Sequence, residues 1–304
     1  MRVFVTGATG FVGSAIVREL IDAGHEVLGL ARSDEAAATL TAAGAAIHRG
    51  SLDDLDSLRQ GAAAADGVIH AAFIHNFADL TTAGETDRLA VEAMGAELAQ
   101  SGRPFVVTSV IGHLTPGQLG TEESAPDSSS SAKHRAGTEE AALSLASQGV
   151  RVSVVRLPLS VHGNGDTGFV PGLIQIARNK GVSGYVEDGL NRWPAVHRLD
   201  AAHLYRLALE IAPAGSVLHA IGDEGVQIRE IAGIIGRQLR LPVVSIPSEE
   251  ALGHFGWLTH FVSMDIPASS SETQEQLDWH PAHPALIPDL DREQYFTTVT
   301  YENG

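Results

Sequence analysis

The sequence predicts an α/β protein built on a doubly wound parallel sheet, and two observations support this. Short apolar, β-rich runs alternate with helical patterns through the first half of the 304-residue chain, as they do in parallel sheets. The first of these runs leads directly into a glycine-rich turn and then into a helical pattern. Because crossovers between parallel strands are right-handed, this alternation folds into a sheet with helices on both faces.

Each predicted strand is a short apolar run, and each predicted helix fills the gap to the next run. Strands are expected over 3–6, 26–30, 45–48, 67–70, 105–108 and 152–156. Helices are expected near 11–22, 34–43, 54–63, 84–101 and 134–148, and later near 171–180, 196–212 and 228–239. The polar segment 121–131 is expected to be a mobile loop, and a strand over 242–246 is followed by a loose tail.

Composition restricts the partners. The net charge of −17 argues against nucleic acid, because phosphate backbones select for Lys and Arg. The chain has no cysteine, which excludes disulfides, thiol catalysis and cysteine-ligated metals, and the spacing of its 14 histidines does not predict a functional metal. With no signal peptide and no apolar run long enough to span a bilayer, we expect a cytoplasmic protein. We expect it to bind a small-molecule substrate and no membrane. A homodimer is compatible with the sequence.

The glycine turn predicts a dinucleotide site. Residues 3–13 read VFVTGATGFVG, so a strand, a turn and a helix follow one another with the required spacing. Gly7 allows the tight turn, Gly10 lets the backbone approach a pyrophosphate, and Gly13 lets the helix pack close to the strand. The phosphates would lie at the positive N-terminus of the helix. The residues expected beside them are Thr9, Phe11 and Val12.

The segment TGATGFVG resembles the TGxxGxxG signature of the extended short-chain dehydrogenase/reductases, an NAD-dependent epimerase/dehydratase-like group. This group includes sugar-nucleotide epimerases, dihydroflavonol reductases and 3β-hydroxysteroid dehydrogenases. The resemblance implies a Rossmann-type domain, a nicotinamide cofactor and a smaller C-terminal substrate domain. We place the first domain at 1–162 plus about 196–222, and the second at 163–195 plus 223–304.

The end of the second strand bears on the choice of dinucleotide. An acid there bonds the ribose 2′-hydroxyl of NAD, whereas a nearby arginine accommodates the 2′-phosphate of NADP. The chain reads GLARSD at this point, so Arg32 and Ser33 occupy the discriminating place. A guanidinium fork suits a phosphate, and we therefore expect NADP (NADPH) rather than NAD. The alternatives are a solvated Arg32 and a ribose contact from Asp34.

Three further segments resemble cofactor-binding segments of the family. Ser51 and Leu52 stand where the family has G-D-L, so the acid that bonds the adenine amino group is replaced, while Leu52 keeps a packing role. The run VIHAAF resembles the family's V-I-H-x-A, which places Ala71 and Ala72 beside the cofactor. The run VVRLP resembles L-R-P, which places Leu157 and Pro158 against the nicotinamide.

The family's catalytic groups are a Ser or Thr after strand five, a Tyr that gives a proton, and a Lys four residues later that lowers the Tyr pKa. Ser109, with Thr108 as second choice, is the candidate for the first group, and it would hold the substrate oxygen. The Tyr-x-x-x-Lys pair is absent, because the four tyrosines lie at 185, 205, 295 and 301.

Two registers remain for the missing pair. Lys133 is the family lysine if Ser129 replaces the tyrosine, whereas Arg135 replaces the lysine if Ser131 replaces the tyrosine. The distance from Glu139 to the end of the helix favours the second register. A serine hydroxyl is a poor acid beside a phenol, so this pattern resembles the atypical members that lack the active-site pair.

Other side chains offer substitute chemistry. His162 stands near the expected nicotinamide position and is a candidate proton donor. Tyr185 is a second candidate acid, in the expected cleft region. Arg192 and Trp193 precede a segment that resembles the family's V-H-V-x-D, and with Tyr185 and Ser109 they are candidate substrate contacts.

These observations support three hypotheses. The first is an NAD(P)H-dependent oxidoreductase that reduces a small or aromatic aldehyde or ketone with a non-standard proton donor. The second is a non-catalytic NADP-binding redox sensor, which the loss of Tyr and Lys favours. The third is a sugar-nucleotide epimerase or dehydratase, which needs the tyrosine most directly.

Overall fold

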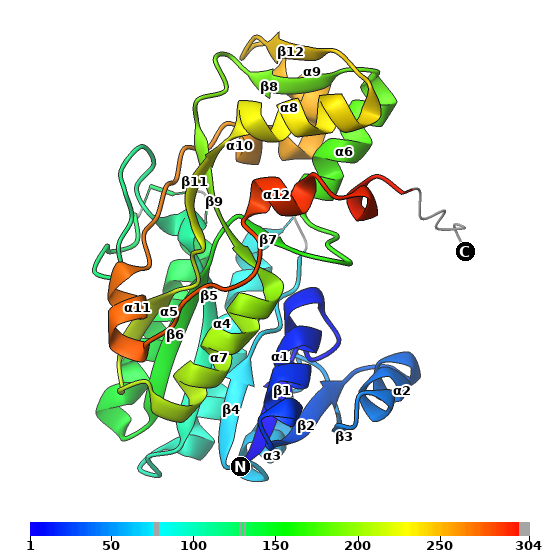
Figure 1. Ribbon diagram of the computed structural model, residues 1–304. Helices are drawn as coiled ribbons and strands as arrows, with labels where there is room; N and C mark the ends of the chain where they lie inside the picture. Colours follow the sequence, from blue (N-terminus) through cyan, green and yellow to red (C-terminus); the bar gives the residue numbers. More distant parts are fainter. Residues whose placement is uncertain (76–78, 128, 131, 298–304) are drawn as a thin grey trace.

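A seven-stranded parallel sheet forms the centre of the protein, with the strand order β10-β6-β5-β4-β1-β2-β3 (Figure 1). The computed structural model describes residues 1–75, 79–127, 129–130 and 132–297. The strands are β1 (Arg2–Thr6), β2 (Glu26–Ala31), β3 (Ala46–Arg49), β4 (Gly67–His70), β5 (Pro104–Val110), β6 (Arg151–Leu157) and β10 (Ser216–His219). The chain builds outward from β1 in one direction and then from β4 in the other. The pair β1–β4 is therefore the switch point at which α/β proteins bind ligands.

Helices cover both faces of this sheet, as the alternation predicted. Helices α1 (Phe11–Asp22), α2 (Asp34–Ala42) and α7 (Arg198–Ile211) pack on one face, and α3 (Leu55–Ala63), α4 (Leu80–Leu98) and α5 (Lys133–Ser144) pack on the other. The side chains of β1 alternate between these layers: Val3 and Val5 face the first and Phe4 the second. Every strand predicted for the first half is present, and the Rossmann-type fold is confirmed.

A smaller unit lies above the carboxyl ends of the strands in Figure 1. It contains a three-stranded sheet of β7 (Ser160–His162), β9 (Arg192–His197) and β11 (Asp223–Gln227), and a two-stranded sheet of β8 (Ser183–Val186) and β12 (Val243–Ile246). Helices α6 (Phe169–Lys180) and α8 (Ile228–Leu239) pack against these strands in a separate apolar core. The helix predicted at 228–239 has these bounds in the structure.

The tail is more ordered than the sequence predicted, and part of it returns to the main domain. It contains α9 (Ala251–Phe255), α10 (Thr259–Val262), α11 (Ser271–Leu277) and α12 (Leu286–Leu290). Leu277 and Trp279 are buried in the core beside α1 and α7, and the Trp279 indole donates to the Asp200 carbonyl at 3.0 Å. Assigning all of 223–304 to the smaller domain is therefore wrong for this stretch.

The expected mobile loop is also wrong for its first residues. Glu122 is buried, and its Oε1 accepts hydrogen bonds from the backbone N–H (2.8 Å) and the hydroxyl (2.6 Å) of Thr273 in α11. The Ser124 carbonyl accepts a bond from Arg156 at 3.0 Å. These partners are remote in sequence, so local polarity gave no sign of them. In the part of the chain that the structure describes, no helix has the length and apolar character needed to cross a membrane.

Candidate active site

The turn between β1 and α1 has the close backbone approaches expected of a dinucleotide cradle. Gly7 has φ +67°, and a Cβ there would lie 2.7 Å from the Ala71 carbonyl carbon and from the Ala72 nitrogen. A Cβ on Gly13 would lie 1.9 Å from the Gly7 carbonyl oxygen. Only glycine therefore allows α1 and the exit of β4 to approach the turn this closely.

The N-terminus of α1 is suited to hold an anion. Gly10 is its N-cap residue, no side chain caps the helix, and the first turn contains no acid. The free N–H groups of that turn therefore have no side-chain acceptor among the described residues and carry the positive end of the helix dipole. A Cβ on Gly10 would have the Gly7 carbonyl oxygen, at 3.2 Å, as its one near neighbour. These features fit the pyrophosphate of a dinucleotide.

The residues after β2 separate into three roles. Ser33 caps α2, because its hydroxyl accepts the Ala36 N–H at 3.2 Å. Asp34 forms an ion pair with Arg49 at 2.5 Å, so its carboxylate is turned toward β3. Arg32 is exposed and forms no ion pair within the described part of the chain. Both ribose candidates are exposed, and they differ in that the charge of Asp34 is paired with Arg49 whereas that of Arg32 has no ion-pair partner in the described residues.

The remaining cofactor candidates line the same edge of the sheet. Thr9 is exposed, and the half-buried residues are Phe11, Val12, Ser51, Leu52, Ala71, Ala72 and Leu157, while Pro158 is buried. Leu52 packs against the apolar layer under α3, and Leu157 against the layer under α1 and α7. Leu157 is the last residue of β6, and the others follow the ends of β1, β3, β4 and β6.

Arg135, the preferred of the two candidates for the lysine position, is held in a buried ion pair. Its Nη1 donates to Asp87 Oδ2 at 2.8 Å and its Nη2 to the Thr108 carbonyl at 2.6 Å, while its guanidinium carbon lies 4.2 Å from the centre of the Phe73 ring. His70 Nε2 bonds the other oxygen of Asp87 at 2.9 Å. Two of the guanidinium nitrogens are thus committed, and Nε is the one without a partner in the described residues.

This network explains how a carboxylate survives in the interior. Asp87 is 1% exposed. Burial raises the pKa of Asp87, but the charge of Arg135 and the hydrogen bond from His70 outweigh burial, so the pKa lies below its ordinary value. His70 also bonds the Thr6 hydroxyl through Nδ1 at 2.7 Å. The His70–Asp87–Arg135 network therefore links β1, β4, α4 and α5 directly beneath the cradle.

Thr108 and Ser109 point to opposite faces of β5. The Thr108 hydroxyl donates to the His70 carbonyl at 2.8 Å and contacts the Tyr205 hydroxyl, from α7, at 2.6 Å. Tyr205 is fully buried, and burial raises its pKa, so this phenol is a poor acid. Ser109 is 1% exposed, and its hydroxyl faces the Glu139 carboxylate without a hydrogen bond of ordinary geometry.

A second buried charge network lies behind Ser109, and sequence reasoning missed it. Arg156 donates to Glu139 through Nε at 3.2 Å and through Nη2 at 2.5 Å, and its Nη1 lies 3.3 Å from His219 Nε2. His113 Nε2 lies 3.5 Å from Glu139 Oε2, and neither ring nitrogen has a hydrogen bond within the described residues. The signal available in sequence was the pairing of Glu139 with an arginine in the L-R-P-like run.

The charges of this second network have opposite consequences for its members. Burial would raise the pKa of Glu139, but the hydrogen bonds and charge of Arg156 hold it below its ordinary value. Burial lowers the pKa of His113 to about 4, against the smaller opposing effect of Glu139. At neutral pH the network therefore contains a carboxylate, a guanidinium and a neutral His113.

With this geometry established, comparison with known proteins decides the family. The model of the NAD dependent epimerase/dehydratase family matches residues 3–220. The chain belongs to this family. It is therefore an oxidoreductase of the epimerase/dehydratase class, and the resemblance drawn from the glycine turn is confirmed.

The proteins that this chain is similar to include an uncharacterized protein, a ketoreductase and a dehydratase. An uncharacterized protein of Schizosaccharomyces pombe is 52% identical over 297 residues, 97% of this chain and 100% of that protein. A 4-hydroxy-2-methyl-3-oxo-4-farnesyl-3,4-dihydroquinoline-1-oxide ketoreductase of Stigmatella aurantiaca is 29% identical over 274 residues, 84% of this chain and 80% of that protein. The crystal structure of DesIV, a dTDP-glucose 4,6-dehydratase from Streptomyces venezuelae with NAD and TYD bound, has a TM-score of 0.78 and 21% identity, and the match covers 97% of each chain. At that identity it supports the fold alone.

For a member of this family, the residues at the expected positions of the Tyr-x-x-x-Lys pair are unusual. Ser131, the preferred substitute for the tyrosine, lies outside the described residues, and Lys133 opens α5. Ser129, the substitute in the other register, donates to Asp127 Oδ1 at 2.7 Å. The committed guanidinium of Arg135 does not present the free charge that the family lysine presents.

Three candidate residues are placed differently from the expectation. Tyr185 lies in β8, which pairs with β12 at the far end of the smaller unit, so the expectation that it lies in the cleft region is wrong (Figure 1). Trp193 is 0% exposed in the core of that unit, so it lines no open surface. His162 is fully buried, with Nδ1 bonded to Asp289 at 2.9 Å, and this bond ties β7 to the tail rather than to a substrate.

Arg192 differs from these residues in being partly open. Its side chain is 40% exposed and forms a two-pronged ion pair with Asp265, with both bonds at 2.9 Å. The pair joins β9 to the segment after α10. Arg192 therefore stays a candidate substrate contact whose charge is already balanced.

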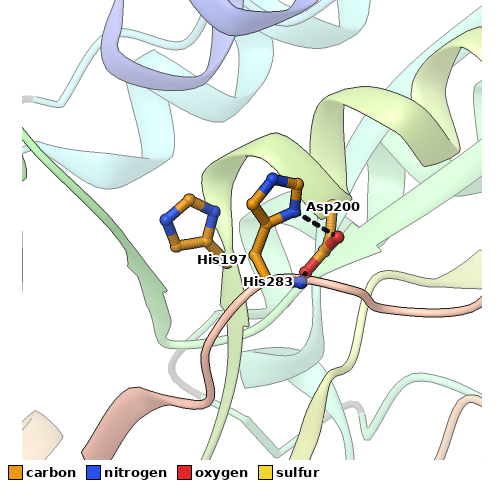
Figure 2. A group of neighbouring side chains, drawn as sticks. All are labelled: His197, Asp200 and His283. Atoms are coloured by element: carbon orange, nitrogen blue, oxygen red, sulfur yellow. Dashed lines mark hydrogen bonds and ion pairs between the residues drawn. The ribbon is translucent and has the colours of Figure 1, made fainter. Parts of the chain in front are cut away.

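His197, Asp200 and His283 form the group of potential metal ligands in Figure 2. Asp200 already accepts from the backbone N–H of Ala282 and of His283, both at 3.0 Å, and from the His283 ring at 2.7 Å. The two imidazoles are stacked with their planes 11° apart, so their in-plane lone pairs do not converge. We interpret the group as a fastening of the tail to the start of α7, and the expectation of no functional metal stays a prediction.

Proposed function

We propose that the protein is an NADPH-dependent reductase of small or aromatic aldehydes and ketones. The observation that carries the proposal is the intact cradle at the β1–α1 turn with the unpaired Arg32 at its ribose end. The ketoreductase name of a relative that aligns with 84% of this chain supports a carbonyl substrate. When bound, the cofactor supplies the hydride. The residues of this chain bind it, orient it and manage the proton.

Each part of the site has one task in this proposal. Gly7, Gly10 and Gly13 let the backbone N–H groups of α1 approach the pyrophosphate, and Arg32 binds the 2′-phosphate. Ser109 is the candidate holder of the substrate oxygen, because its hydroxyl has unspent hydrogen-bonding capacity at the end of β5. Since this hydroxyl is covered in the structure, the side chains above it must move for substrate to reach it.

The proton donor differs from that of the usual family member. The Tyr205 phenol contacts the Thr108 hydroxyl near the end of β5, but Tyr205 is fully buried, and burial raises its pKa. His113 is neutral at pH 7, because burial lowers its pKa to about 4. We therefore propose that water delivers the proton to the alkoxide oxygen, and that such a reductase is slow compared with a family member that has the tyrosine.

The test is steady-state oxidation of NADPH and NADH with a panel of aldehydes and ketones. We expect turnover with kcat/KM at least tenfold higher for NADPH, and loss of that preference in Arg32→Ala. Ser109→Ala should lower kcat/KM by about tenfold or more, as the loss of one oxygen-holding donor does. Full activity in Ser109→Ala would contradict the oxygen-holding role of Ser109 but not the proposed reductase activity.

One observation favours a second function, a non-catalytic NADP-binding redox sensor. The guanidinium that replaces the family lysine is committed to Asp87 and to the Thr108 carbonyl, and so it stabilises structure rather than a reacting group. Saturable NADPH binding with no oxidation by any carbonyl of the panel is the result that would establish the sensor over the reductase.

A further inference from the structure

Arg198 stands next to the cradle although it lies far from the glycine turn in sequence. Its guanidinium carbon is 4.8 Å from the centre of the Phe11 ring. Phe11 is the first residue of α1, and Arg198 is the first residue of α7. The two helices pack together on one face of the sheet, with both N-termini at the carboxyl edge (Figure 1). The guanidinium therefore lies beside the uncapped turn at which a pyrophosphate would bind.

The charge of Arg198 is not balanced by the protein. Nη1 donates to the Asn164 carbonyl at 3.0 Å, and no acid lies within ion-pair distance in the ranges that the structure describes. Several buried or half-buried arginines of this acidic chain have such a partner, as in Arg135–Asp87, Arg156–Glu139 and Arg206–Glu19. Three other half-buried arginines lack an acid in the described ranges, but each donates to backbone carbonyls within the fold: Arg103, Arg151 and Arg178. Arg198 differs from these three in lying against Phe11 at the start of α1. Burial lowers the pKa of Arg198, which shows that the cation is partly removed from water. An unpaired, partly buried charge costs free energy unless a ligand balances it.

Open space adjoins Arg198. A cavity of about 330 Å³ beside it is lined also by Asn164, His197, His283, Asp289 and Arg292, and the residues of the glycine turn are not part of this lining. The Phe11 ring covers one face of the guanidinium and Nη1 donates to the Asn164 carbonyl, so Nε and Nη2 are the nitrogens left for an anion in the described residues. A planar guanidinium binds phosphate oxygens through two parallel hydrogen bonds, which a flexible lysine does not.

We propose that Arg198 binds the pyrophosphate of the dinucleotide from the α7 side, while Arg32 binds the adenosine end from the β2 side. The inference rests on the proposed function, because it requires a bound dinucleotide. It adds a residue of the return segment to the site and gives the phosphates the positive charge that the cradle itself lacks. Because NAD and NADP share the pyrophosphate, the role is independent of the choice between them.

The experiment compares two ligands by isothermal titration calorimetry: NADP⁺, and 2′-AMP, which contains the adenosine and the 2′-phosphate but no pyrophosphate. We expect Arg198→Ala to weaken NADP⁺ binding by tenfold to a hundredfold and to leave 2′-AMP binding within twofold of wild type. Arg32→Ala should weaken both ligands. Arg292→Ala removes a cation from the same cavity, one that lies 3.4 Å from Asp289, and serves as the matched control with NADP⁺ binding within twofold of wild type.

The outcomes separate the two proposals. Unchanged NADP⁺ affinity in Arg198→Ala overturns the pyrophosphate role, and so does an equal loss for 2′-AMP, which would indicate a structural effect. If Arg198→Ala does not fold, Arg198→Gln and the salt dependence of its NADP⁺ affinity replace it, with a shallower slope than wild type expected and an unchanged slope contradicting the role. A wild-type protein that binds no dinucleotide overturns the proposed function together with this inference.

Discussion

The turn after β1 and the end of β5 lie at the same edge of one sheet, yet they have diverged in opposite ways. The turn keeps each feature that a dinucleotide requires, since Gly7 and Gly13 stand where a Cβ would overlap backbone atoms. Beside the end of β5 the family tyrosine is absent, and Arg135 in α5 stands at the lysine position in the preferred register. That arginine is bound into a buried ion pair instead of facing a ligand.

The two regions differ because cofactor binding depends on backbone atoms, whereas proton transfer depends on side chains. Binding at the turn depends on backbone N–H groups and close packing, so almost any substitution of its glycines disrupts it. Proton transfer depends on single side chains, which can change without loss of the fold when new partners satisfy their neighbours. The two charge networks around Asp87 and Glu139 are such partners. We therefore propose that the protein has kept its cofactor site, while Arg135 at the preferred lysine position has taken a structural role.

The most damaging change to the turn should be Gly13→Ala. Its Cβ would lie 1.9 Å from the Gly7 carbonyl oxygen, so helix and turn must separate. Overpacking of this kind costs about 1–3 kcal/mol, and we expect dinucleotide affinity to fall by roughly 100-fold in a calorimetric titration.

Gly137→Ala is the control for this variant. Gly137 lies within α5, and its Cβ would meet no atom within 4 Å. We expect unchanged affinity and a gain in stability of up to about 1 kcal/mol from helix propensity. Wild-type affinity in Gly13→Ala would show that the close approach of α1 to the turn is not required for binding.

The converted region should be most sensitive at Asp87. In Asp87→Ala the buried guanidinium of Arg135 and the ring of His70 lose their shared acceptor. Breaking one side of a buried ion pair typically costs about 3–5 kcal/mol, which urea unfolding would measure. Asp56→Ala breaks the exposed pair with Arg59 instead, and should cost less than about 1 kcal/mol. Similar losses for the two variants would contradict a structural role for the network.

A smaller effect is expected from pH. Burial lowers the pKa of His113 from 6.5 to about 4, so the unfolded chain binds more protons than the folded protein between these values. The neutral His113 ring therefore adds to the free energy of unfolding above pH 6.5. This contribution is lost as the pH falls toward 4, at up to about 1.4 kcal/mol per pH unit. Unfolding free energies of wild type and His113→Gln, measured across this range, should show a shallower slope in the variant. Parallel slopes would mean that His113 is already solvated in the folded protein.

The sequence predicted the features that depend on neighbouring residues and missed those that depend on contacts between residues far apart in the chain. The glycine turn and the strands follow from short segments whose geometry is fixed by neighbouring residues, and the structure has them where they were predicted. The cofactor roles of the turn and of Arg32 stay predictions. Two contacts between the main domain and the tail were not predicted, Trp279 with the Asp200 carbonyl and Glu122 with Thr273, because the partners are far apart along the chain. Tyr185 and Trp193 were expected in a cleft, since sequence alone does not tell which face of a strand is buried.

The account is tested most directly by calorimetric titration of the wild-type protein with NADPH and with NADH. It predicts saturable binding of NADPH at one site per chain, with at least tenfold weaker binding of NADH, although the chain has neither the family tyrosine nor its lysine. Absence of saturable binding by either dinucleotide would contradict the claim that the cradle has kept its function while the catalytic position changed.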